Sequence, residues 1–306
     1  MPEECSVIVS TYSKNRLAYV IKCVESLRKQ SRPPEEIILV LDPDQELFDL
    51  YKSKVPPYVK IIVCDQKGLS NARNAGIDKG EGSILAFIDD DAIADELWLE
   101  RLLENFNESS VVGAGGIIKP LWEGRNPVWF PEELYWIIGC SYKGLPEHRA
   151  SVRNPIGCNM SFRKSSFARA GYFRSDIGRF GKKLLAGEET ELSMRMLGEI
   201  PDSRIIYDPS AIVYHSVEKD RKSLIYLFKR SFYEGVSKAI IGNSRSSPSA
   251  SLLSEDQYLK YLLKKSIPTR LRRIFHPANL CHLVVLCFSV SAVVAGYLTQ
   301  NLAKGE

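Results

Sequence analysis

Residues 83–91 read Ser83-Ile-Leu-Ala-Phe-Ile-Asp-Asp-Asp91, an apolar run that ends in three consecutive carboxylates. A short apolar run bounded by polar residues is typical of a strand buried on both faces. Similar runs occur upstream at 5–10, 36–41 and 59–63. After the first of them, apolar residues at helical spacing predict a helix over 16–30, and these are Leu17, Val20, Ile21, Val24 and Leu27. Strands that alternate with helices in this way predict an α/β fold with a mostly parallel sheet.

Polar residues follow the predicted strands at the points where the strands end. They are Ser10, Tyr12, Asp42, Asp89 and Asp91. Ligands of open α/β sheets bind outside the carboxyl ends of the strands. We therefore expect these side chains to line one crevice.

The composition excludes several classes of protein. The 306 residues are 44% hydrophobic, which is enough for a substantial core, and the net charge of +4 is too small for a typical nucleic-acid binder. The seven cysteines are scattered without a C-x-x-C pair, which argues against a zinc or redox site. Reduced cysteines in apolar runs, together with an acidic N-terminus that shows no signal peptide, predict a protein that faces the cytosol.

The second half of the chain is less regular. Residues 120–147 are rich in Trp and Pro, and two interpretations remain open: an acceptor-binding surface, or core and lid packing. Downstream we predict a helix over 187–197, a strand over 204–214, and helices over 223–241 and 252–265.

We expect three parts along the chain. A catalytic domain over 1–242 comprises a nucleotide-binding half (1–95) and an acceptor-binding half (96–242). A polar linker over 243–251 leads to a basic helical tail over 252–306.

The tail has the composition of a membrane anchor. Its apolar segment at 280–298 is close to the roughly 20 residues that span a bilayer. Arg270, Arg272 and Arg273 precede it, which keeps the upstream body in the cytoplasm under the positive-inside rule. We predict attachment to the cell membrane, by spanning or by partial insertion, and a buried C-terminal helix is the alternative.

The acidic triplet Asp89-Asp90-Asp91 suits a hard divalent cation, Mn²⁺ or Mg²⁺, that bridges carboxylate and diphosphate. A solvated turn is the alternative. Upstream, Gly68-Leu-Ser-Asn-Ala-Arg-Asn-Ala-Gly76 reads as a loop that leads into a short helix. Arg73 in this stretch can offer a planar fork to a phosphate, or can simply lie in solvent at a helix start.

Together these motifs resemble family 2 glycosyltransferases with the GT-A fold. The likeness covers residues 5–240 and is carried by Ser10-Thr-Tyr-Ser13, Asp42, Gly68-Leu-Ser-Asn-Ala-Arg-Asn74, Asp89-x-Asp91, Gly157-Cys-Asn-Met-Ser161 and Gly187-Glu-Glu-Thr-Glu-Leu192. The resemblance implies a mixed, mostly parallel sheet flanked by helices. It also implies transfer of a sugar from a nucleotide diphosphate sugar.

The resemblance also implies roles for single residues. The donor would be held by Ser10, Tyr12, Asp42, Arg73, Asp89, Asp90, Gly157 and Asn159, and the metal by Asp91, Asp89 and His215. Glu189 would be the general base with Glu188 as its orienter. A UDP-sugar is expected before a GDP-sugar. Leu41 stands where many members carry a second Asp, and this departure leaves uridine as the base unsettled.

A general base is needed for a hydroxyl acceptor and not for a phosphate acceptor. The expected acceptor is therefore a sugar on a lipid carrier, at a membrane surface. The expected reaction inverts the configuration of the donor carbon. Trp122-Glu-Gly-Arg-Asn-Pro-Val-Trp-Phe-Pro131, Gly139-Cys-Ser-Tyr142 and Arg153-Asn-Pro-Ile-Gly157 resemble archaeal enzymes that build lipid-linked N-glycans. That group includes glucuronosyltransferases that act on dolichyl-phosphate sugars. For a uronic acid donor, the partner of the carboxylate would be Arg153, Arg163 or Arg179.

Two other classes compete with a transferase. A nucleotidyltransferase would carry a Gly-rich basic loop after the first strand, and Ser10–Ser13 is not one. An inactive sugar-binding scaffold would have no need for the intact Asp89-x-Asp91 and Glu188-Glu189.

Overall fold

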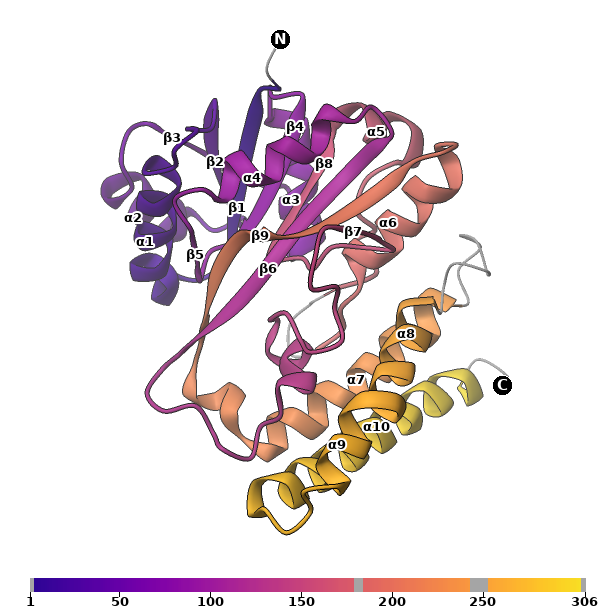
Figure 1. Cartoon of the computed structure of the whole chain (residues 1–306). Coiled ribbons are helices and arrows are strands. Elements are labelled where there is room, and N and C mark those ends of the chain that lie inside the picture. Colours follow the sequence, from indigo (N-terminus) through magenta and orange to yellow (C-terminus); the bar gives the residue numbers. More distant parts are fainter. Residues whose placement is uncertain (1–2, 179–183, 243–252, 304–306) are drawn as a thin grey trace.

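The computed structural model describes residues 3–178, 184–242 and 253–303. Within this part of the chain, nine strands form one sheet in the order β3-β2-β1-β4-β8-β6-β9-β5, with β7 paired to β9 (Figure 1). Their bounds are β1 (Cys5–Thr11), β2 (Glu36–Leu41), β3 (Val59–Val63), β4 (Ile84–Asp89), β5 (Ala92–Ala94), β6 (Val111–Trp122), β7 (Ala150–Val152), β8 (Asn159–Arg163) and β9 (Arg204–Val217). The predicted α/β fold is confirmed.

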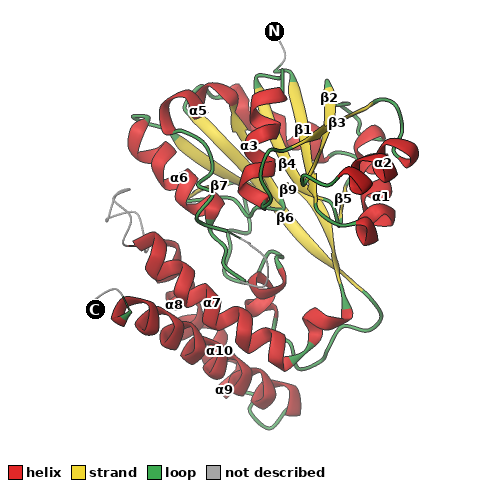
Figure 2. Cartoon of the chain, turned by 180° about the vertical axis from the view of Figure 1, so that it is seen from behind, coloured by secondary structure: helices red, strands yellow, loops and turns green. Residues whose placement is uncertain are grey.

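The N-terminal half of the sheet is parallel, as its alternating sequence predicts. β1 pairs in parallel with β2 and β4, and β2 pairs in parallel with β3. Two buried apolar clusters lie on opposite faces, because Val7 and Val9 of β1 join one and Ile8 joins the other. The helices that cover the faces are α1 (Leu17–Arg28), α2 (Gln45–Lys54), α3 (Leu69–Lys79), α4 (Trp98–Glu104), α5 (Lys164–Ala170) and α6 (Glu188–Glu199), and both faces can be followed in Figures 1 and 2.

Antiparallel strands make the sheet mixed in its second half. β8 runs antiparallel to both β4 and β6, whereas β6 and β9 run parallel. The predicted strand over 204–214 continues to Val217, and the predicted loop after Gly68 is already helical from Leu69. Short 3-10 segments complete this part: η1 (Lys14–Arg16), η2 (Asn105–Asn107), η3 (Glu132–Ile138) and η4 (Lys219–Lys222).

The C-terminal helices form a layer beside the sheet (Figure 1). They are α7 (Leu224–Gly242), α8 (Leu253–Tyr261), the π-helical turn η5 (Leu262–Ser266), α9 (Ile267–Leu271) and α10 (Pro277–Leu302). The backbones of α7 and α10 are in direct contact, because a Cβ on Gly296 would lie 2.0 Å from the carbonyl oxygen of Phe232. The buried hydroxyls of Ser231 and Ser289 are 2.6 Å apart across the same contact.

The tail is fastened to the aromatic-rich stretch of the body. Glu133 on η3 accepts hydrogen bonds from both terminal nitrogens of Arg270, at 2.7 and 2.8 Å, and from Ser266 at 2.8 Å. Trp136 donates to the hydroxyl of Tyr258 at 3.4 Å. Of the two interpretations of residues 120–147, packing is the one observed at these positions. The predicted linker over 243–251 lies outside the described residues.

Candidate active site

The pairing of β5 with β9 places His215 beside the acidic triplet. Ala92 is the register partner of His215, and Ser216 N donates to the carbonyl oxygen of Asp91 at 2.9 Å. The Nε2 atom of His215 consequently lies 3.2 Å from Oδ1 of Asp91. Ligand atoms of Asp89, Asp91 and His215 all lie within 4.8 Å of one another.

These three side chains fit a divalent metal ion. Oδ1 of Asp91 is buried with Nε2 of His215 3.2 Å away, and it makes no well-aligned hydrogen bond among the described residues. Two carboxylates and one imidazole are hard and borderline ligands of the kind that bind Mn²⁺ and, less commonly with imidazole, Mg²⁺. The cluster therefore brings together the three residues predicted to hold the metal.

Two arginines that the sequence analysis missed also reach the triplet. Arg16 bonds to Asp90 and lies 3.1 Å from Oδ2 of Asp91, and Arg221 lies 3.7 Å from the same oxygen. Burial alone would raise the pKa of Asp91, but His215 and the two guanidinium groups hold it well below its usual range. Burial and the charge of Asp91 raise the pKa of Asp90.

The positions of these two arginines in the sequence could have indicated that they lie near the acidic triplet. Arg16 follows the end of the first strand, and Arg221 follows the last strand of the sheet by four residues. Both lie where strand ends converge. The pattern was missed because an arginine in a polar loop looks like an ordinary surface cation.

Arg73 binds carboxylates of the protein. Its Nη1 is 2.7 Å from Glu188, and its Nη2 is 3.6 Å from Asp89 and 3.2 Å from the carbonyl oxygen of Gly157. The guanidinium also lies over the ring of Phe173, 5.5 Å from its centre. The expected fork toward a phosphate is thus occupied, and Arg73 instead joins α3 to α6 and to the end of β4.

The two glutamates at the start of α6 differ in environment. Glu188 is buried against Arg73, and its Oε2 has no hydrogen-bond partner within the described chain. Part of the Glu189 residue is exposed, but its carboxyl group is surrounded by protein atoms. Burial raises the pKa of Glu189 to about 8, and the adjacent Glu188 carboxylate adds to the shift. A carboxyl group with a pKa near neutrality has the proton affinity that a general base needs.

The residues predicted to hold the nucleoside lie along neighbouring strand ends. Ser10 on β1 is the register partner of Val40 on β2 and of Asp89 on β4. Asp42 accepts a hydrogen bond from Gly68 N at 3.3 Å, and burial raises its pKa. Tyr12 is 65% exposed, with the guanidinium of Arg16 5.3 Å from its ring centre.

The predicted donor contact Asn159 is bonded within the protein. Asn159 is fully buried, donates to the carbonyl oxygens of Ile117 (3.2 Å) and Ala211 (3.0 Å), and accepts from Trp98 (2.8 Å). Its amide therefore forms hydrogen bonds to neighbouring strands and is not exposed to a donor sugar.

Of the three arginines considered for a uronic acid, Arg163 is also excluded. It pairs with Ile84 at the opposite end of β4 from Asp89, and it binds Glu3 at 2.6 Å. Arg179 lies outside the described residues. Arg153 binds Glu255 of α8 through both terminal nitrogens.

Known proteins resemble this chain over nearly its whole length. The sequence profile described as glycosyl transferase family 2 matches residues 6–171. A glucosyl-dolichyl phosphate glucuronosyltransferase of Haloferax volcanii is 33% identical over 98% of both chains. The succinoglycan biosynthesis protein ExoM of Rhizobium meliloti is 27% identical over 77% of this chain and 75% of its own.

Solved structures show the same fold at low identity. The mannosyltransferase PcManGT of Pyrobaculum calidifontis, in complex with GDP-Man and Mn²⁺, superposes with a TM-score of 0.62 at 14% identity, covering 100% of this chain and 89% of that one. GalNAc-T7 with UDP, GalNAc and Mn²⁺ gives a TM-score of 0.53 at 16% identity, covering 86% of this chain and 56% of that one. These likenesses establish the GT-A architecture.

Proposed function

The chain belongs to glycosyl transferase family 2, and from that premise we propose that it moves a hexuronic acid from a nucleotide diphosphate sugar to a hydroxyl group of a lipid-linked saccharide. The observation that carries the proposal is the Asp89, Asp91 and His215 cluster, which Arg73 connects to Glu188, the neighbour of Glu189 at the start of α6. The full-length likeness to a glucuronosyltransferase that acts on a dolichyl phosphate sugar supports the choice of substrates.

The proposed chemistry is a single displacement with inversion. Glu189 takes the proton of the acceptor hydroxyl as the new bond forms, and Glu188 with Arg73 orients the start of α6. Mn²⁺ or Mg²⁺ held by Asp91, Asp89 and His215 would supply positive charge to the departing diphosphate. Arg16 and Arg221 lie close enough to Asp91 to add to that charge.

We assign the nucleoside to the strand ends that carry Ser10, Tyr12 and Asp42, beside Asp90 and Gly157. The exposed ring of Tyr12 provides a surface on which a base can stack. We propose a UDP-sugar as the donor, and a GDP-sugar is the alternative.

The membrane association suggested by the apolar C-terminal helix takes a specific form in this proposal: α10 lies in the interface and does not cross the bilayer. α10 is long and apolar enough to cross by length and composition, with 17% of its apolar window buried. Spanning would pull α7 into the lipid with it, because the two backbones are in contact and α7 carries Arg230, Glu234 and Lys238.

An interfacial position matches the surface of the tail. The turn before α10 exposes Phe275 fully, next to exposed Arg272 and Arg273. Apolar side chains exposed on α9 and α10 continue this surface, and they are Leu271, Leu280, Val284, Phe288, Val294, Leu298 and Leu302. Apolar residues flanked by cations suit the headgroup region of an anionic bilayer, and we place the catalytic body on its cytoplasmic side.

The proposal is tested by titrating the full chain in detergent with UDP, UDP-glucose, UDP-glucuronic acid and GDP-mannose, with and without Mn²⁺. Turnover is then measured with dolichyl phosphate glucose as acceptor. We expect Mn²⁺-dependent binding of the UDP compounds and transfer of glucuronic acid. Better turnover of neutral hexoses than of the uronic acid would reject the donor, and binding of GDP-mannose alone would reject UDP.

A further inference from the structure

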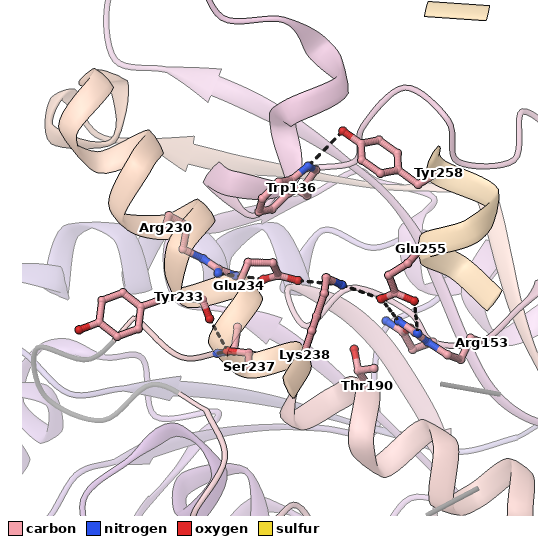
Figure 3. Close-up of polar contacts among 12 residues, drawn as sticks. Trp136, Arg153, Thr190, Arg230, Tyr233, Glu234, Ser237, Lys238, Glu255 and Tyr258 are labelled. Carbon is pink, nitrogen blue, oxygen red and sulfur yellow. Dashed lines mark hydrogen bonds and ion pairs between the residues drawn. The ribbon is translucent and has the colours of Figure 1, made fainter. Parts of the chain in front are cut away.

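Five charged side chains form a continuous series of ion pairs beside the start of α6 (Figure 3). On α7, Glu234 lies 2.9 Å from Arg230 and 3.2 Å from Lys238. Lys238 continues to Glu255 of α8 at 2.6 Å. Arg153, which follows β7, closes the series on Glu255 with Nη1 at 2.6 Å and Nη2 at 3.1 Å. Three cations therefore face two carboxylates, so the cluster carries a surplus positive charge.

The cluster lies next to the candidate base. Ala186 N donates to Ser237 Oγ at 3.1 Å, and a Cβ on Gly187 would lie 2.5 Å from Ile241, so α7 touches the segment that leads into Glu189. Figure 3 shows Thr190, the residue after Glu189, pointing toward the contacts of Lys238 with Glu255. The series of ion pairs thus lies beside the helix start that carries Glu189.

Glu255 is held in the manner of a bound oxyanion. Both of its carboxylate oxygens accept charge-assisted hydrogen bonds, two from the planar fork of Arg153 and one from Lys238. The side chains of Arg153 and Lys238 are only 9% and 27% exposed, which strengthens these bonds. This is the geometry with which proteins recognise the carboxylates and phosphates of ligands.

We propose that Arg153 and Lys238 form an oxyanion-binding site for the substrate beside Glu189, which Glu255 fills in the structure described here. The anion is the carboxylate of an acidic donor sugar or the phosphate of a lipid-linked acceptor. The inference rests on the proposed function and extends it to specificity. Exchange of one oxyanion for another keeps both cations paired, so it avoids the large cost of a buried unpaired charge.

The attachment of the tail does not depend on Glu255 alone. The Glu133–Arg270 pair is a second buried, two-bonded Arg–Glu contact between tail and body. Glu133 lies on η3 and Arg270 on α9, and neither residue belongs to the series of ion pairs beside α6. Neutralising Glu133 therefore provides a matched control for the structural consequences of removing a buried carboxylate.

The test uses the full chain in detergent with Mn²⁺, as wild type, Arg153→Gln, Glu255→Gln and Glu133→Gln. The donor arm compares the affinities for UDP-glucuronic acid and UDP-glucose. The acceptor arm compares the KM for dolichyl phosphate glucose with that for the uncharged octyl glucoside. The affinity for UDP, which carries neither the sugar carboxylate nor the lipid phosphate, shows that each variant is folded.

We expect Glu255→Gln to favour the anionic probe over its neutral counterpart by about tenfold in one arm, because a competing carboxylate is removed. Arg153→Gln should disfavour the same probe by about tenfold or more, and Glu133→Gln should leave both ratios unchanged. A change in the donor arm identifies the sugar carboxylate, and a change in the acceptor arm identifies the lipid phosphate.

Unchanged ratios in both arms for Arg153→Gln would overturn the inference while leaving the proposed function intact. Equal effects of Glu255→Gln and Glu133→Gln would also overturn it, because they would show a structural role. Failure of the wild type to bind either UDP or GDP-mannose would instead reject the proposed function, and this inference with it.

Discussion

Arg73 on α3 and Glu188 on α6 form a buried ion pair at 2.7 Å although 115 positions separate them in the sequence. The pair joins the helix after the third strand to the helix that presents Glu189. Arg73 also lies 3.6 Å from Asp89, so one guanidinium sets the spacing between the metal cluster and the base. The metal cluster and the helix that carries the base are therefore connected through Arg73.

Loss of Arg73 should destabilise the protein as well as the site. Arg73→Met leaves Glu188 buried without its partner, which should cost about 3–5 kcal/mol of unfolding free energy. Denaturant unfolding of the single variants and of Arg73→Met with Glu188→Leu measures this cost and the coupling. If the double variant were no more stable than Arg73→Met, the unpaired Glu188 carboxylate would not be the cause.

Asp91 should dominate metal binding. Substituting a residue that merely supports a ligand usually costs about 10–100-fold in metal affinity, so Asp91→Asn should cost more than about 100-fold. Electron paramagnetic resonance of Mn²⁺ in the presence of UDP measures the affinity without turnover. Asp95→Asn, on the same chain segment beyond β5, is the matched control and should bind Mn²⁺ as the wild type does. Equal affinities for Asp91→Asn and wild type would remove Asp91 from the metal site.

The rate of transfer should rise with pH up to about the pKa of Glu189. Burial raises that pKa to about 8, so the carboxyl group is largely protonated at neutral pH and gains the basic form as pH increases. Glu189→Gln should lower kcat by about 10²–10⁴-fold and abolish this limb of the profile. A profile of kcat between pH 6 and about pH 9 for both proteins provides the comparison.

The raised pKa of Glu189 also makes the stability of the folded protein depend on pH. Because the folded state binds a proton more tightly than the unfolded state, its stability falls as pH rises from the ordinary value of 4.5 to about 8. Glu189→Gln should therefore raise Tm relative to wild type at pH above about 8 and have less effect near pH 4. A constant difference in Tm across this range would contradict a raised pKa.

The tail should bind anionic membranes through its exposed arginines and apolar side chains. Replacing Arg272 and Arg273 by Ser should remove about 1 kcal/mol each, or roughly 30-fold in total affinity for anionic vesicles. Phe275→Ser should weaken binding to anionic and neutral vesicles alike, because it removes apolar burial. Co-sedimentation with the two kinds of vesicle separates these effects. Membrane association that resists alkaline extraction would show that α10 spans the bilayer.

The strands of the N-terminal half and the acidic triplet at the end of β4 were predictable from local pattern. A buried parallel strand requires a continuous apolar run, and the residue after it must lie at the ligand edge of the sheet. The runs at 36–41 and 59–63 coincide with β2 and β3 for this reason. The motif set also predicted the family, which the comparison confirmed.

Contacts between distant segments were decided only by the tertiary structure. His215 reaches Asp91 because β5 and β9 pair in one register, and Asn159 turns inward because β8 runs antiparallel between β4 and β6. The hydrophobic pattern of a strand indicates which of its residues share a face, but it identifies neither the neighbouring strand nor the direction of pairing. The same holds for Arg73, whose charge is recognisable in the sequence but whose partner Glu188 is selected by the packing of α3 and α6 around the sheet.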